Sequence, residues 1–259
     1  MSLPPVSIIC PTYGRTACVS ELLDCFRRCE YDGELELFLV NDVPEQTLFV
    51  DNLQHGWGKN KRINIQNHPE RYDSLGGKRN ACVLGAAYDH FLFVDDDDIF
   101  LPDYPSDMMR MFLTWEKPTY PVSYIHAEGK GDGIKMTYKP QSHPASYLAT
   151  RKQFFDVGGY PFVYAGGDQI IRSKLFKAYD CQTNKQPLRV YFMNRPGYVY
   201  RWGNGTYHIS GNADHASAWI RTHASLQKRL DSGEEPSGFI ILEPKWDVDY
   251  IALAEKVIQ

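Results

Sequence analysis

The stretch Val6-Ser7-Ile8-Ile9-Cys10-Pro11-Thr12-Tyr13-Gly14-Arg15 decides the fold class of this sequence. Its first five residues are a short β-prone run, and the other five close that run as a turn. Helical periodicity follows from Thr16 to Cys29, and a second apolar run from Leu35 to Val40 ends in Asn41-Asp42. This strand–helix–strand spacing predicts a parallel βαβ unit.

The carboxyl ends of parallel strands meet at one edge of a sheet, and ligands of open α/β sheets bind just beyond that edge. Tyr13 follows the first predicted strand, and Asp42 follows the second. We therefore expect both residues at a ligand-binding edge.

The composition is ordinary for a globular protein. The chain has 259 residues, of which 43% are hydrophobic and 23% are charged, so it is long enough for a sizeable core. A formal net charge of −4 excludes the global basic field that attracts nucleic acid.

No targeting segment is evident. The first five residues lack the charged and apolar regions of a signal peptide, and no stretch approaches 18 apolar residues. The six cysteines include no C-x-x-C pair, and Cys18, Cys25 and Cys29 share one face of the first predicted helix. We expect buried, reduced thiols in a cytoplasmic protein without a transmembrane segment.

The rest of the chain alternates helical and strand patterns. We expect helices over Gly77 to Tyr88, Gln169 to Tyr179 and Asp247 to Ile258, strands over Phe91 to Val94, Arg189 to Met193 and Tyr198 to Trp202, and strands with loops from Tyr120 to Ala149.

Four adjacent carboxylates, Asp95-Asp96-Asp97-Asp98, follow the apolar strand that ends at Val94. An isolated acidic run is usually a solvated turn, but this one lies between two apolar runs. Adjacent carboxylates repel each other, and partial burial increases the repulsion. A divalent cation removes this penalty, and Mg²⁺ and Mn²⁺ prefer such oxygen ligands. The pattern therefore indicates a metal site.

A second acidic candidate is Asp168, in Gly166-Gly167-Asp168-Gln169 at a predicted helix start. One interpretation is an N-cap, because aspartate accepts backbone N–H bonds there. The other is a reactive carboxylate, since the two glycines let a substrate approach closely. The two interpretations are compatible.

Three weaker features complete the candidates. The segment Gly76-Gly77-Lys78-Arg79-Asn80 lacks the spacing of a P-loop, but its basic pair could neutralise a diphosphate. His208 lies in a polar, glycine-rich segment, although a lone histidine is usually no ligand. Rings near the C-terminal half could stack on a sugar, although core packing explains most of them, namely Tyr191, Tyr198, Tyr200, Trp202, Tyr207 and Trp219.

Taken in order, these pieces resemble the family 2 glycosyltransferases of the GT-A fold. The resemblance covers roughly residues 5 to 210. It rests on the opening stretch and on five later matches: Val40-Asn41-Asp42, Gly77-Lys78-Arg79-Asn80, Phe93 to Pro102, Gly158-Gly159-Tyr160 followed by Gly167-Asp168, and Tyr200-Arg201 with His208.

This sequence departs from the family pattern at several positions. Asn41 and Gly167 replace acidic residues, and Cys82 stands where glycine is common. His208 lies farther from Tyr200-Arg201 than the metal-binding histidine of the family usually does.

The resemblance implies a Rossmann-like mixed sheet in a single GT-A-like domain over 1–259. About 1–110 would be the nucleotide-sugar-binding half, and about 111–259 the acceptor-binding and catalytic half. It implies that the donor contacts Pro11, Thr12, Tyr13, Arg15, Asp42, Arg79, Asp95 and Asp96.

The resemblance also implies metal ligands and a catalytic base. Asp97 ligates Mn²⁺ or Mg²⁺ whether the motif is D-x-D, with Asp95, or D-D, with Asp96, and His208 completes the site. Asp168 deprotonates the acceptor hydroxyl, which attacks the anomeric carbon with inversion. A base must contact that hydroxyl, so it must be separate from the metal carboxylates.

The substrates are only partly implied. The donor is a nucleotide-sugar, with a UDP-sugar favoured by family analogy. The acceptor is a glycan, polysaccharide or glycoconjugate; nucleic acid enters only as an acceptor, through a hydroxylated base in phage DNA. Two alternatives stay open: a nucleotidyltransferase-like enzyme, which would need a glycine-rich basic loop after the first strand, and an inactive nucleotide- or sugar-binding module.

Overall fold

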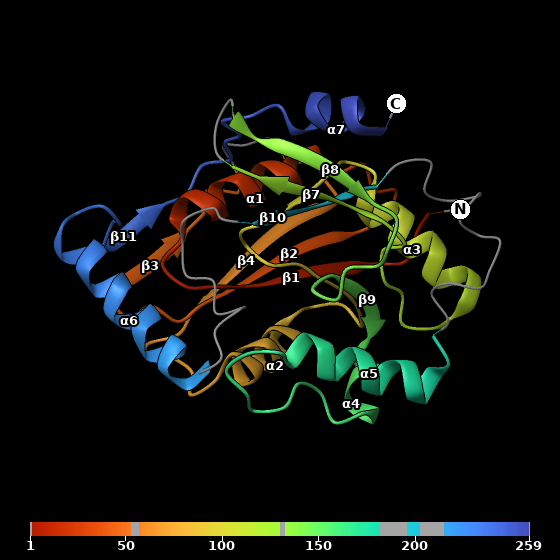
Figure 1. Cartoon of the computed structure of the whole chain (residues 1–259), viewed down its shortest axis with the longest axis horizontal. Coiled ribbons are helices and arrows are strands. Elements are labelled where there is room, and N and C mark those ends of the chain that lie inside the picture. Colours follow the sequence, from red (N-terminus) through yellow and green to blue (C-terminus); the bar gives the residue numbers. More distant parts are fainter. Residues whose placement is uncertain (1, 53–56, 130–132, 182–195, 203–214, 259) are drawn as a thin grey trace.

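The computed structural model of the chain describes residues 2–52, 57–129, 133–181, 196–202 and 215–258. It is a mixed α/β fold whose main sheet has the strand order β4-β2-β1-β5-β9 (Figure 1). The predicted βαβ unit is present, because β1 and β2 pair in parallel on either side of α1 in the sequence. The bounds are β1 Val6–Thr12, α1 Thr16–Arg28, β2 Leu35–Asn41, β4 Lys61–Asn67, β5 His90–Phe93 and β9 Tyr147–Thr150.

Helices cover both faces of this sheet. Alternate residues of β1 enter different cores: Ile8 packs in a cluster with residues of α1, and Ile9 packs in a second cluster with residues of α2, α4 and α5. These helices span Leu75–Gly85, Arg151–Asp156 and Gly167–Tyr179, and they lie across the sheet from α1 (Figure 1). Every residue of β1 and β2 is buried as a result.

A second sheet brings the far end of the chain to the acidic run. Its order is β6-β10-β7-β8, and β10 pairs antiparallel with β6, placing Tyr198 opposite Phe100. This sheet and helix α3 comprise β6 Ile99–Phe100, α3 Tyr104–Trp115, β7 Tyr124–Glu128, β8 Lys135–Lys139 and β10 Tyr198–Trp202.

The remaining elements flank the main sheet. Two short strands, β3 Gln46–Phe49 and β11 Gly238–Ile241, pair in parallel, and α6 His215–Asp231 lies beside them (Figure 1). The last helix, α7, spans Tyr250–Ile258.

Some element boundaries differ from the sequence predictions for local reasons. Helix α2 begins at Leu75 and not at Gly77, because the Ser74 hydroxyl caps it by accepting a bond from Gly77 N at 3.0 Å. Helix α7 begins at Tyr250, three residues after the predicted start. The predicted strand Arg189 to Met193 lies outside the described residues.

All six cysteines are free thiols, as predicted, and five of them are buried. In the ranges that the structure describes, no helix is both long enough and apolar enough to cross a bilayer.

Helix α2 packs closely against the segment before α5, and a substitution at Gly76 tests this packing. Gly76 is buried, and its N–H donates to Val163 O at 3.3 Å. A Cβ atom added there would lie 1.8 Å from Pro161 O. We predict that Gly76→Ala lowers the free energy of unfolding by about 1–3 kcal/mol, because backbone must move to relieve the overlap.

Thermal and urea denaturation measure this change. Gly133→Ala is the matched control, because a Cβ at Gly133 meets nothing within 4 Å. Equal loss of stability in both variants, or none in Gly76→Ala, would contradict the described packing.

Candidate active site

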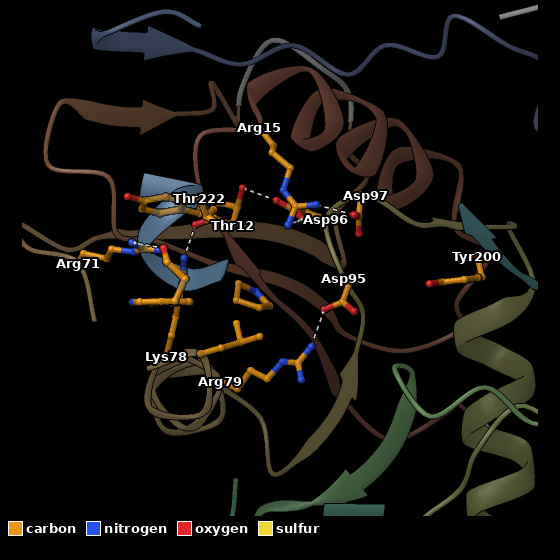
Figure 2. A pocket seen from close by; sticks show the side chains of 14 residues that line it. Thr12, Arg15, Arg71, Lys78, Arg79, Asp95, Asp96, Asp97, Tyr200 and Thr222 are labelled. Carbon is orange, nitrogen blue, oxygen red and sulfur yellow. Dashed lines mark hydrogen bonds and ion pairs between the residues drawn. The ribbon is translucent and has the colours of Figure 1, made fainter. Parts of the chain in front are cut away.

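A pocket opens beyond the carboxyl ends of β1 and β5, at the predicted sheet edge (Figure 2). It gathers segments far apart in sequence: the turn after β1, the start of α2, the acidic run after β5, strand β10 and helix α6. Its lining residues are Pro11, Thr12, Tyr13, Arg15, Arg71, Leu75, Lys78, Arg79, Asp95, Asp96, Asp97, Tyr200, Trp219 and Thr222.

The four consecutive aspartates have different environments. The Asp95 side chain is 25% exposed and that of Asp97 is 10% exposed, and both line the pocket. Asp96 is buried and accepts a hydrogen bond from Thr12 Oγ1 at 2.6 Å. Asp98 is also buried and does not line the pocket. The acidic run is therefore not a solvated turn.

Asp98 anchors strand β10 to the acidic run. Its carboxylate accepts bonds from the Tyr198 hydroxyl and, at 2.9 Å, from Arg201 N. Arg201 Nε in turn donates to Asp97 O. Burial raises the pKa of Asp98 well above its usual range, and the neighbouring Asp97 raises it further. Sequence reasoning missed this role, because the partner strand lies about a hundred residues away.

Basic side chains neutralise the carboxylates of the pocket. Arg15 Nη1 lies 2.5 Å from Asp97 Oδ2, and Arg79 Nη2 lies 3.1 Å from Asp95 Oδ1 (Figure 2). Arg15 Nη2 also lies 3.4 Å from Asp96 Oδ1. These guanidinium groups offset the repulsion within the acidic run.

The carboxylate oxygens of Asp95 and Asp97 suit Mg²⁺ or Mn²⁺, because these ions prefer oxygen ligands. Within the described ranges, however, no group of three His, Cys, Asp or Glu residues is arranged to hold a metal ion. Arg15 and Arg79 pair with Asp97 and Asp95 instead. A cation bound here would therefore replace these arginines at the carboxylates, and donor phosphates would supply further oxygen ligands.

Asp42 does not line the pocket itself but contacts Lys78, which does. It is fully buried, and its carboxylate accepts bonds from Lys78 Nζ and, at 3.0 Å, from Tyr72 N. Lys78 Nζ also donates to Thr12 O and lines the pocket. Asp42 therefore adjoins the pocket through Lys78, and its predicted contact with the nucleotide stays a prediction.

Helix α6 closes the other end of the pocket over Tyr13. The Tyr13 hydroxyl lies 2.7 Å from His223 Nδ1, and the guanidinium of Arg71 lies over the rings of both Tyr13 and Trp219. Sequence reasoning missed Arg71 and Thr222, which carry no motif. Only the helical spacing of Trp219, Thr222 and His223 hinted at a shared face.

Asp168 is not a helix cap. The N-cap of α5 is Gly166, in the left-handed conformation with φ 71°, and Asp168 is the second residue of the helix. It accepts no hydrogen bond from any residue in the described part of the chain. Asp168 still influences the pocket through Arg79. Burial lowers the pKa of Arg79, but the nearby Asp95 raises it above its usual value, and Tyr160 and Asp168 raise it further.

Asn80 fixes the segment that leads to Asp168. Its side-chain amide donates to Tyr160 O at 3.0 Å and accepts from Tyr160 N at 2.9 Å. The two neighbouring residues therefore have different roles, since Arg79 faces the acidic run and Asn80 holds the loop before α5 through Tyr160. His208 lies outside the described residues.

Comparison with known proteins fits this arrangement. The family model described as "Glycosyl transferase family 2" matches residues 7–179. No curated protein matches the chain.

Solved structures share the fold at low identity. TarS of S. aureus, residues 1–349 in complex with UDP-GlcNAc, superposes with a TM-score of 0.56 at 15% identity, covering 86% of this chain and 65% of TarS. The UDP complex gives 0.50 at 16%, covering 88% and 72%. The mannosyltransferase PcManGT of Pyrobaculum calidifontis, with GDP-Man and Mn²⁺, gives only 0.46 at 14%, covering 67% and 52%.

The fold is thus the GT-A fold of glycosyltransferases. The chain belongs to glycosyl transferase family 2, because the family model spans more than half of it. It spans 65% of the length of the TarS chain that it matches.

The environment of Asp95 predicts an unusual pH dependence of stability. Burial raises its pKa from 3.8 to about 6, opposed by Arg79 and assisted by Asp97. Folding therefore favours the protonated form, and this contribution is complete below about pH 4 and lost as the pH rises through 6. Without divalent metal, we predict that the melting temperature of Asp95→Asn falls less between pH 5 and 7.5 than that of the wild type.

Thermal scans across this pH range provide the measurement. Asp156→Asn is the control, because its hydrogen bond from Lys152 lowers the pKa of this exposed carboxyl and keeps it ionised throughout. Parallel pH profiles for Asp95→Asn and wild type would show that Asp95 does not titrate in this window.

Proposed function

We propose that this protein transfers a sugar from a nucleotide-sugar donor to an acceptor hydroxyl, with inversion and with the help of a divalent cation. One observation carries the proposal: a single pocket at the carboxyl edge of the sheet joins the carboxylates of Asp95 and Asp97 to the cations Arg15, Lys78 and Arg79. Such a mixture suits a metal-bound diphosphate. Membership of glycosyl transferase family 2 supports it.

The two ends of the pocket suggest how the donor lies. The acidic run and its arginines form the end suited to the diphosphate, while Tyr13 and Trp219 offer rings for the nucleoside at the other. TarS, which shares the fold, was solved with UDP-GlcNAc. A UDP-sugar is therefore the first donor to test.

Asp97 and Asp95 would hold Mn²⁺ or Mg²⁺, in the D-x-D register. Their exposure favours this register over D-D, since Asp96 is buried and bonded to Thr12. His208 is proposed as a third protein ligand. When bound, the cation would stabilise the charge on the departing nucleoside diphosphate.

Asp168 is the proposed general base. An inverting displacement forms a bond from the acceptor oxygen to the anomeric carbon and breaks the bond to the diphosphate, while the hydroxyl proton passes to the base. Asp168 is half-buried in the first turn of α5, where an acceptor can approach its side chain. Its freedom from hydrogen bonds in the described structure leaves its oxygens available to an acceptor.

The acceptor is proposed as a glycan, polysaccharide or glycoconjugate, with a hydroxylated base in phage DNA as the less favoured class. The net charge of −4 speaks against a polyanionic acceptor held by long-range attraction. Incubation with nucleotide-sugars and Mn²⁺, with and without candidate acceptors, tests the activity through release of nucleoside diphosphate. Absence of both release and donor binding across a donor panel would refute the function.

Asp97→Ala should abolish the dependence of donor binding on Mn²⁺. The change removes the carboxylate that both registers of the motif assign to the cation. Calorimetric titration of UDP-sugar with and without Mn²⁺ measures the effect, and Asp156→Ala, an exposed carboxylate on α4, is the matched control. Undiminished Mn²⁺ dependence in a folded Asp97→Ala protein would remove Asp97 from the metal site.

Asp168→Asn should leave donor binding nearly unchanged but reduce the transfer rate by about 10²–10⁴, the usual contribution of a positioned base. Asparagine preserves the shape of the side chain and the helix start, so the fold should survive. Turnover assays with a working acceptor, set beside donor titrations of the same variant, separate the two steps. Near-normal turnover would leave the base unassigned.

A further inference from the structure

Large apolar side chains lie exposed along one edge of the molecule, and none of them lines the pocket. The most exposed is Phe162, at 81%, in the loop that leads to α5. Ile220 of α6 is 68% exposed, and Leu84 of α2 is 63% exposed. Helices α6, α2 and α5 follow one another along this edge (Figure 1). We call these exposed residues the apolar edge, namely Leu84, Phe162, Tyr164, Ile170 and Ile220.

Contacts join the apolar edge across separate elements. A Cβ atom added at Gly77 would lie 3.3 Å from Phe162 Cε1, so the Phe162 ring lies against the start of α2. Leu84 follows Gly77 by seven residues, about two helical turns, and therefore lies on the same face of α2. The ring centroids of Tyr164 and Trp219 are 5.9 Å apart, which links the same loop to α6.

Helix α2 presents no charged side chain at this edge. Its two charged residues, Lys78 and Arg79, are buried and line the pocket. Toward solvent the helix presents Gly77, Ala81 and Leu84. A surface helix usually carries its charged residues on its outer face. An apolar outer face is instead typical of a helix that contacts another apolar surface.

Lysines continue the apolar edge along α5 and α6. Lys174 and Lys177 follow Ile170 by four and seven residues, so they share its face of α5. Lys228 follows Ile220 by eight residues on α6. Together these two helices contain six basic residues and two acidic ones, although the whole chain has a net charge of −4. Basic residues are therefore in local excess beside the apolar edge.

Exposed carboxylates near the edge reduce this excess without reversing it. Asp156 of α4 is already paired with Lys152, whose Nζ lies 2.6 Å from its Oδ2. Glu70 and Asp73 lie in the segment before α2 and are exposed. The surface therefore combines protruding apolar side chains with a modest positive charge.

We propose that the apolar edge docks on a membrane surface that contains anionic lipids, with the Phe162 side chain inserted among the lipid chains. This inference does not depend on the proposed function. Lipids close around a ring that stands clear of its neighbours, whereas a protein partner would need a matching cavity. The aliphatic side chains of Leu84, Ile170 and Ile220 gain free energy in lipid but find no apolar partner on a nucleic-acid backbone. Lysines beside them complement anionic headgroups.

This docking would also orient the pocket. Trp219 lines the pocket and contacts Tyr164 of the apolar edge. Tyrosine and tryptophan rings are favoured at the level of the headgroups, where one part of the ring is apolar and the other is wet. The rim of the pocket would therefore lie close to the lipid surface.

Co-sedimentation of the protein with vesicles of phosphatidylcholine and phosphatidylserine in equal parts tests the docking. We expect binding at least about tenfold tighter than to phosphatidylcholine alone. Phe162→Ser should weaken binding to the mixed vesicles by about 10- to 100-fold, because it removes one inserted ring. Its melting temperature should stay unchanged, since the side chain is exposed. Phe239→Ser is the matched control, with a ring 66% exposed on β11.

The charge contribution has its own variant. Lys174→Glu combined with Lys177→Glu should abolish the preference for mixed vesicles over phosphatidylcholine. Lys135→Glu combined with Lys139→Glu is the matched control, on strand β8 at the opposite side of the molecule (Figure 1). An equal effect of both pairs would show that the docking is not confined to this edge, and would overturn the proposal.

Three further outcomes would overturn it. The first is absence of vesicle binding by the wild-type protein, and the second is an equal loss of binding in Phe162→Ser and Phe239→Ser. The third is a different occupant of the same surface. Sedimentation analysis would show it as self-association abolished by Phe162→Ser, and titration with single-stranded DNA would show it as binding tighter than that to vesicles. Donor binding and transfer, measured without vesicles, test the proposed function separately.

Discussion

The compensation of four adjacent carboxylates at the end of strand β5 is the constraint on which the rest of this structure depends. Ionised aspartates this close destabilise each other, and burial makes the repulsion stronger. Each aspartate has polar partners, and Arg15 serves two of them: Arg79 for Asp95, Thr12 with Arg15 for Asp96, Arg15 for Asp97, and Tyr198 with Arg201 N for Asp98.

These partners also hold distant parts of the chain together. Arg201 donates through Nε to Asp97 O, and its Nη1 lies 2.6 Å from Glu21 Oε2 of α1 and 2.9 Å from the Tyr250 hydroxyl of α7. The Tyr250 hydroxyl itself donates to Glu21 Oε1 at 2.8 Å. One network therefore joins the acidic run, strand β10, the first helix and the last helix. The stability of the C-terminal region and the geometry of the site are consequently coupled.

The carboxylates and the arginines of the pocket neutralise each other in this structure. We propose that donor binding replaces internal ion pairs by external ones, with a cation at the carboxylates and phosphates at the freed arginines. Such an exchange costs less than creating new charges in a buried site, because opposite charges are paired before and after.

Much of the fold and the acidic part of the site could be predicted from the sequence, because both depend on patterns among residues that are close together in the chain. The βαβ unit follows from the periodicity of residues 6–41, and the carboxylates adjoin the strand that carries them. Family resemblance added the GT-A fold. Local patterns failed where two explanations shared one signature, as at Asp168, which resembled a cap until Gly166 proved to be the N-cap.

Only the tertiary structure decided which charged residues pair with each other and which lie at the pocket. Asp42 and Asp95 carry the same side chain, but long-range partners bury Asp42 behind Lys78 and leave Asp95 25% exposed at the pocket. Arg71 and Trp219 are 148 residues apart, and neither belongs to a motif. The sequence by itself predicted that Tyr13 and Asp42 lie at one ligand-binding edge, because the carboxyl ends of parallel strands meet at the same edge of a sheet. The pairing among the charged residues depends on packing between distant segments, which short-range patterns do not encode.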